Sequence, residues 1–161
     1  MTACWLITSF NYYMLQFLIN TFKQVYVTAI LSSVSEIMGI VAGGAFYTKL
    51  GLSKSLSMSY LIGVIGAVAI VLYGLQHQDE LIFPLLVLIA KFGIASAFNI
   101  LYISHADIFP VLFAATALGF ANFVSRIATG ISPVIAFMEE PVPMVAFMLL
   151  AMIGVFIPWG V

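Results

Sequence analysis

Long, uninterrupted apolar stretches dominate the chain, and short polar or Pro/Gly breaks separate them. Each stretch has about the 20 residues that a helix needs to cross the hydrocarbon core of a bilayer. The stretches are continuous and lack the ten-residue alternation of membrane β-barrel strands. The pattern predicts an all-α fold, a polytopic membrane bundle with six transmembrane helices. The expected spans are residues 4–22, 25–48, 55–75, 81–104, 112–138 and 141–161.

The breaks between these spans are short, so we expect residues 1–161 to form a single transmembrane domain without a separate soluble one. The first span has no basic leading region, which argues against a cleavable signal. Lys49 and Lys54 fall in the second break, whereas the third (76–80) and fifth (139–141) are acidic. Because cytoplasmic loops are enriched in basic residues, this distribution predicts that the second and fourth breaks and both termini share the cytoplasmic or equivalent side.

Composition excludes a water-soluble protein. Charged residues make up 7% of the chain and hydrophobic residues 64%, whereas a soluble domain is about a quarter charged. The net charge is −1 and no basic tract is present, so nucleic acid is not an expected partner. The single cysteine, Cys4, excludes an internal disulfide, and neither His77 nor His105 has companions at metal-ligand spacing. We therefore expect no cofactor, no metal and no enzymatic activity.

Three charged residues lie inside the apolar spans instead of between them: Glu36, Lys91 and Arg126, each near the middle of its span. An ionisable group at the bilayer centre costs roughly 2.5–3.5 kcal/mol, so these side chains should face a polar cavity or one another. A structural interpretation makes Glu36 the buried charge partner of Lys91 or Arg126. A functional interpretation notes that two cations against one anion leave an excess of positive charge, which favours an anionic solute.

Helical spacing gathers polar side chains on particular faces of the spans. The groups are Thr8, Tyr12, Gln16 and Asn20 on the first span, Lys91, Asn99 and Tyr102 on the fourth, and Asn122, Arg126 and Thr129 on the fifth. Gly39 and Gly43 on the second span have the small-residue spacing that lets helices approach closely. These faces are expected to point toward the interior of the bundle.

Four stretches carry a resemblance to a known family. They are KFGIASAFN at 91–99, ADIFP at 106–110, SRI at 125–127 followed by SP at 132–133, and TSFNYY at 8–13. Together they resemble the C-terminal half of a major facilitator superfamily transporter, and most closely the organic anion and organic cation transporter group. The resemblance covers nearly the whole chain, as the last six of the family's twelve helices.

This resemblance implies that Tyr12, Tyr13, Lys91 and Arg126 line a central cavity and bind a small organic anion. It further implies alternating access, in which two halves rock around a site at the membrane midplane. Lys54 and Asp107 are the candidates for the cytoplasmic gate or latch, with Lys54 standing where the family carries adjacent arginines. Because six helices make only half of such a fold, the expected partners include the missing N-terminal half or other membrane subunits, besides the lipid bilayer.

Two functions therefore compete on the sequence alone. The first is one half of an organic anion transporter. The alternative is a transport-inactive accessory or structural subunit of a larger membrane complex, for example in the mitochondrial inner membrane. Either function places the chain in a membrane, and the sequence leaves both the plasma membrane and the mitochondrial inner membrane open.

Overall fold

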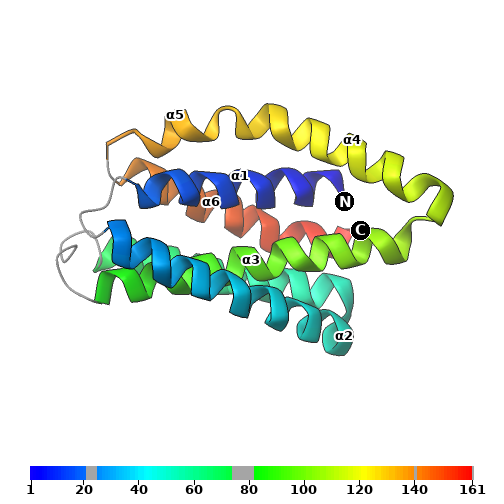
Figure 1. Cartoon of the computed structure of the whole chain (residues 1–161), viewed down its shortest axis with the longest axis horizontal. Coiled ribbons are helices and arrows are strands. Elements are labelled where there is room, and N and C mark those ends of the chain that lie inside the picture. Colours follow the sequence, from blue (N-terminus) through cyan, green and yellow to red (C-terminus); the bar gives the residue numbers. More distant parts are fainter. Residues whose placement is uncertain (21–24, 74–81, 140, 161) are drawn as a thin grey trace.

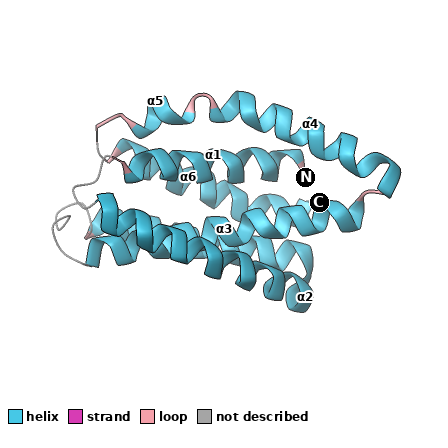
Figure 2. Ribbon diagram, in the orientation of Figure 1, coloured by secondary structure: helices cyan, strands magenta, loops and turns pink. Residues whose placement is uncertain are grey.

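The computed structural model describes residues 1–20, 25–73, 82–139 and 141–160, and its regular elements in these ranges are all helices (Figure 2). They are α1 (Thr2–Ile19), α2 (Val25–Leu72), α3 (Ile82–Ile108), α4 (Val111–Thr129), α5 (Ser132–Ala136), α6 (Val142–Phe156) and a final 3-10 helix, η2 (Ile157–Gly160). The predicted all-α class is confirmed. The first break, at Lys23, and the third, at 76–80, lie outside the described residues.

Four helical stretches of the described chain are long and apolar enough to cross a membrane: Val25–Leu72, Ile82–Ile108, Val111–Ala136 and Val142–Trp159. The six separate spanning helices expected from the sequence are therefore not confirmed. The second and third expected spans form the single element α2, because the break around 49–54 stays helical except at Gly51. α1 does not count among the four, and polar residues such as Asn11 and Gln16 lower its hydropathy.

Gly51 divides α2 into two arms, residues 25–50 and 52–72. Its φ of +73° lies in the left-handed region, which glycine adopts without the steric penalty of a Cβ. The chain of α2 runs from one end of the molecule to the other and then returns (Figure 1). The second break of the sequence thus reverses the chain through one residue and needs no longer loop.

α3 packs against both arms of α2, and glycines permit the close approach. A Cβ on Gly43 of the first arm would lie 2.7 Å from the Ser96 carbonyl oxygen of α3. A Cβ on Gly93 of α3 would lie 2.6 Å from the Ser59 carbonyl oxygen of the second arm. Gly39 is equally confined, so the prediction that the Gly39 and Gly43 spacing serves close helix packing is confirmed.

α1 contacts α3 and also the group formed by α4, α5 and α6 (Figure 1). Polar side chains that turn inward from α1 find partners on distant elements. Thr8 and Tyr60 share a hydrogen bond of 2.6 Å between their hydroxyl oxygens, and the Trp5 indole donates to His105 Nδ1 at 3.1 Å. His105 is thus a buried structural residue, and the described chain contains no group of three or more potential metal ligands.

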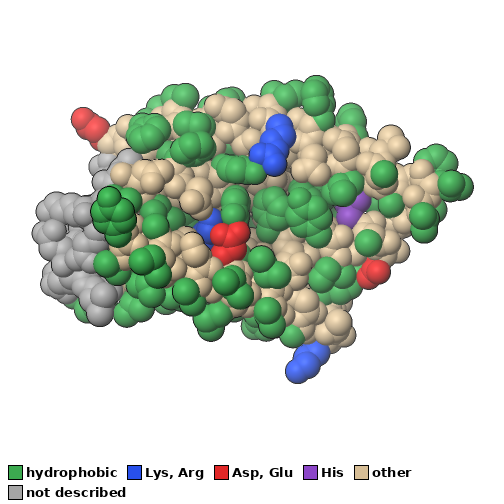
Figure 3. Space-filling view, viewed as in Figure 1, with side chains coloured by type: hydrophobic (Ala, Val, Ile, Leu, Met, Phe, Trp, Pro, Cys, Tyr) green, Lys and Arg blue, Asp and Glu red, His purple; other side chains and the backbone are tan. Residues whose placement is uncertain are grey.

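The stretch formed by α4 and α5, Val111–Ala136, is the least buried of the four apolar stretches. The expected span 112–138 is divided between them after Thr129, close to Pro133, whose ring removes a backbone donor. α4 buries only small residues and exposes large ones such as Phe120 and Phe123. Hydrophobic side chains cover much of the face in Figure 3, with few charged groups among them. Exposed apolar surface of this kind requires lipid or another protein surface against it.

The connections between helices gather at two ends of the molecule. The turn at Gly51 and the α3–α4 connection lie toward one end, and the marks for both termini are nearer to this end (Figure 1). Lys49 and Lys54 flank Gly51 and are exposed. The α5–α6 connection, which includes Glu139, lies at the opposite end. The assignment of the lysine-bearing end to the cytoplasmic side stays a prediction.

Candidate solute-binding site

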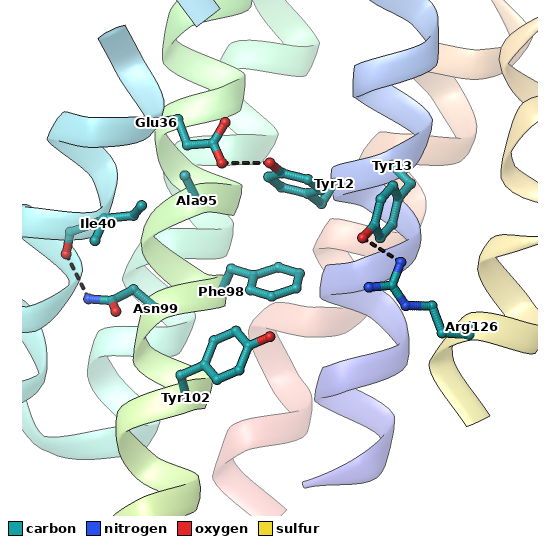
Figure 4. A pocket seen from close by; sticks show the side chains of 9 residues that line it. All are labelled: Tyr12, Tyr13, Glu36, Ile40, Ala95, Phe98, Asn99, Tyr102 and Arg126. Carbon is teal, nitrogen blue, oxygen red and sulfur yellow. Dashed lines mark hydrogen bonds between the residues drawn. The ribbon is translucent and has the colours of Figure 1, made fainter. Parts of the chain in front are cut away.

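A cavity of about 240 Å³ lies between α1, the first arm of α2, α3 and α4. Its lining is Tyr12 and Tyr13 from α1, Glu36 and Ile40 from α2, Ala95, Phe98, Asn99 and Tyr102 from α3, and Arg126 from α4 (Figure 4). The structure thus brings together Tyr12, Tyr13 and Arg126, three of the four residues expected to bind the solute. Glu36, the expected charge partner, joins them.

Helix geometry explains how each element contributes to this lining. On α3, Ala95, Phe98, Asn99 and Tyr102 are spaced at i, i+3, i+4 and i+7, which places them on one face of a helix. On α2, Glu36 and Ile40 are four residues apart and share a face in the same way. The Asn99 amide donates to the Ile40 carbonyl oxygen at 2.7 Å, which fixes α3 against the first arm of α2.

Aromatic rings form a continuous wall of the cavity. The ring centroids of Tyr12 and Phe98 are 5.3 Å apart, and those of Phe98 and Tyr102 are 5.5 Å apart. Tyr13 meets Tyr12 edge to face at 5.4 Å. Such a wall offers apolar faces for the carbon skeleton of a solute, and the tyrosine hydroxyls add polar groups at its edges.

Arg126 is the one basic residue of the lining, and its side chain is exposed. One guanidinium nitrogen donates to the Tyr13 hydroxyl, and the guanidinium carbon lies 4.8 Å from the centre of the Tyr13 ring. A guanidinium has five N–H donors, so this contact leaves others available. Its planar fork matches the two oxygens of a carboxylate. Arg126 is therefore positioned to bind an anionic group in the cavity.

Lys91 does not belong to the lining, although the sequence placed it among the solute-binding residues. Its side chain is 0% exposed. The ammonium donates to Gln16 Oε1 at 2.9 Å, lies 3.8 Å from Glu36 Oε2 and is 3.7 Å from the centre of the Tyr12 ring. Lys91 therefore lies behind Tyr12 and Glu36, which both line the cavity and share a hydrogen bond of 2.5 Å.

The two latch candidates lie apart from the cavity lining. The Asp107 carboxylate accepts a hydrogen bond of 2.7 Å from the Tyr47 hydroxyl. Lys54 is exposed, and no ion pair joins it to Asp107 in the described ranges. Their role in a latch stays a prediction.

The sequence interpretation did not name Phe98, Asn99 and Tyr102 as site residues. A signal was present, because Asn99 and Tyr102 share the polar face of α3 and Phe98 lies in the stretch that carries the family resemblance. Lys91 was chosen from that helix for its charge, whereas the neighbouring ring and amide residues occupy the surface of the cavity.

Comparison with known proteins identifies relatives of the chain. It is 31% identical over 134 residues to solute carrier family 22 member 4 of Mus musculus, and this match covers 80% of this chain and 23% of that protein. It is 25% identical over 130 residues to organic cation/carnitine transporter 2 of Rattus norvegicus, covering 80% of this chain and 23% of that protein. Human solute carrier family 22 member 13 is 23% identical over 137 residues, covering 84% of this chain and 24% of that protein.

No family model matches the chain. The relatives confirm the resemblance drawn from the sequence, and they are transporters of the membrane and not enzymes. The match spans about a quarter of the length of these curated relatives. The match to these relatives and the apolar helices together identify the chain as an integral membrane protein. The chain is thus a relative of the solute carrier family 22 transporters, and it matches only a part of their length.

Proposed function

We propose that this chain forms one wall of the central cavity of a membrane transporter, and that this cavity binds a small organic anion. The observation that carries the proposal is the position of Arg126, whose exposed guanidinium faces a cavity otherwise lined mainly by aromatic and apolar groups. In such surroundings a fork of N–H donors attracts a carboxylate more strongly than it would in water.

Binding would use two parts of the cavity. The carboxylate of the solute would contact Arg126, with the Tyr13 hydroxyl beside it. The carbon skeleton would lie against the rings of Tyr12, Phe98 and Tyr102. A cavity of about 240 Å³ is below the usual range of about 300–1,000 Å³ for ligand pockets. This size favours a small solute whose remaining surface is covered by an opposing wall.

That opposing wall would come from a second membrane domain, in the same polypeptide or in a separate one. The exposed apolar face of α4 supports this requirement. Without a second domain, lipid would contact the charged side chain of Arg126, which is exposed on the same helix. We further propose that α1, the two arms of α2, α3, α4 with α5, and α6 make six crossings. Rocking of this unit against the second domain would then expose the site to each side of the membrane in turn.

No feature of the described structure favours the alternative of a transport-inactive accessory subunit. Such a subunit would not need an exposed arginine, an aromatic wall and a cavity at the same place. Transport is therefore the one function that we propose.

Uptake assays test the proposal in cells that express the natural transcript carrying this chain. The probes are tritiated phenylacetate and tritiated benzyltrimethylammonium, which share a benzyl group and carry opposite charges. We expect saturable uptake of phenylacetate above that of cells carrying an empty vector. Equal phenylacetate uptake by the two kinds of cell would overturn the proposal.

A further inference from the structure

We infer that Lys91 determines the charge preference of the cavity by neutralising Glu36 from behind, without contacting the solute. This inference deepens the proposed function and rests on it. The names of the relatives include an organic cation and carnitine, so the charge preference of this cavity has to be derived from its own side chains.

The contacts of Lys91 keep its ammonium away from the solute. Its ammonium already has an amide acceptor in Gln16, a carboxylate in Glu36 and an aromatic face in Tyr12. With a side chain that is 0% exposed, it has no open path to a solute. A direct contact would require breaking these interactions and moving the Tyr12 ring aside.

Glu36 lies between Lys91 and the space for the solute. Its carboxylate lines the cavity and is 31% exposed, so it lies between the solute space and Lys91. Tyr12 donates to one carboxylate oxygen, and Lys91 approaches the other. Glu36 is the one acidic residue of the lining, and it is compensated on its buried side.

The charges of Lys91, Glu36 and Arg126 together set the charge preference of the cavity. While Lys91 and Glu36 compensate each other, the charge left in the lining is the +1 of Arg126, and an anion is favoured. Without the lysine, Glu36 and Arg126 would offset each other. A cation could then use the Glu36 carboxylate together with the aromatic faces, an arrangement that attracts quaternary ammonium groups.

Equilibrium binding to the protein, purified in lipid nanodiscs together with the second membrane domain, tests the inference, again with phenylacetate and benzyltrimethylammonium. For Lys91→Gln we expect phenylacetate to bind about tenfold more weakly and benzyltrimethylammonium about tenfold more tightly, because a unit charge has been removed near the solute. The decisive variant is the double substitution Lys91→Gln with Glu36→Gln. It removes both charges, keeps side chains of similar size and restores the net charge of the lining.

A neutralising role predicts that the double variant recovers phenylacetate binding to within about threefold of the wild type and loses the gained affinity for the cation. If Lys91 contacts the solute, the double variant binds phenylacetate as poorly as Lys91→Gln, and the inference is overturned. Should Lys91→Gln not yield folded protein, the double variant decides alone, since it leaves no unpaired buried charge. Wild-type protein that binds neither probe would refute the proposed function itself, and this inference with it.

Discussion

Replacement of Arg126 by glutamine should lower the uptake of phenylacetate about 100-fold at subsaturating concentration, which corresponds to about 2.7 kcal/mol of lost binding free energy. The loss is large because Arg126 is the one basic residue of the lining. Glutamine keeps a polar side chain but has neither the charge nor the two-pronged donor geometry. The measurement is initial-rate uptake, normalised to the amount of protein at the cell surface.

Two companion variants separate charge from geometry. Arg126→Lys keeps the positive charge and loses the planar fork, so we expect an intermediate loss of about tenfold. Lys49→Gln removes an exposed cation near Gly51, at a distance from the cavity lining, and should leave uptake close to that of the wild type. If Arg126→Gln transports as well as Lys49→Gln, Arg126 does not bind the solute.

The second large effect concerns the packing of α3 on α2. Gly93→Ala should lower the free energy of unfolding by about 1–3 kcal/mol, because the added methyl group has no space. Its Cβ would lie 2.6 Å from the Ser59 carbonyl oxygen and 2.9 Å from the Gly63 Cα. These neighbours are backbone atoms, which cannot rotate away as a side chain could. Thermal unfolding in nanodiscs, followed by circular dichroism at the helix band, measures the loss.

Gly119→Ala is the matched control for this effect. Gly119 also lies within a helix, α4, but a Cβ there would meet nothing within 4 Å. Alanine is favoured over glycine in a helix by up to about 1 kcal/mol, so this variant should be neutral or slightly stabilising. Equal melting temperatures for the Gly93→Ala and Gly119→Ala variants would contradict the close packing of α3 on the second arm of α2.

Much of the fold follows from the sequence, because a membrane-spanning helix needs an uninterrupted run of apolar residues. Those runs predicted that the elements of the described chain are helices, but the six separate spans expected from them are not confirmed. The sequence did not predict that α2 remains helical on both sides of Gly51, because the two lysines beside this glycine indicated a polar loop. The apolar runs also overestimated the continuity of the fifth span, which Pro133 helps to divide.

The site could be predicted only in part, because periodicity shows which residues share a face and not which faces meet. Arg126 and Tyr13 are 113 positions apart, and their contact depends on the packing of α4 against α1. The same limitation affected Lys91. Its charge marked it as important, but its direction is set by Gln16, 75 positions away on α1. Only the packed bundle places it behind the cavity.

Protection of an engineered cysteine by phenylacetate tests most directly whether the solute occupies this cavity. Ile40 lines the cavity and is 45% exposed, so Ile40→Cys should react with a membrane-impermeant thiol reagent. The native Cys4 is 1% exposed and adds little background, and Lys49→Cys provides an exposed control away from the cavity lining. Saturating phenylacetate is predicted to slow the reaction at position 40 several-fold and to leave position 49 unchanged. Unaltered rates at both positions, in protein that still binds phenylacetate, would contradict the assignment of this cavity.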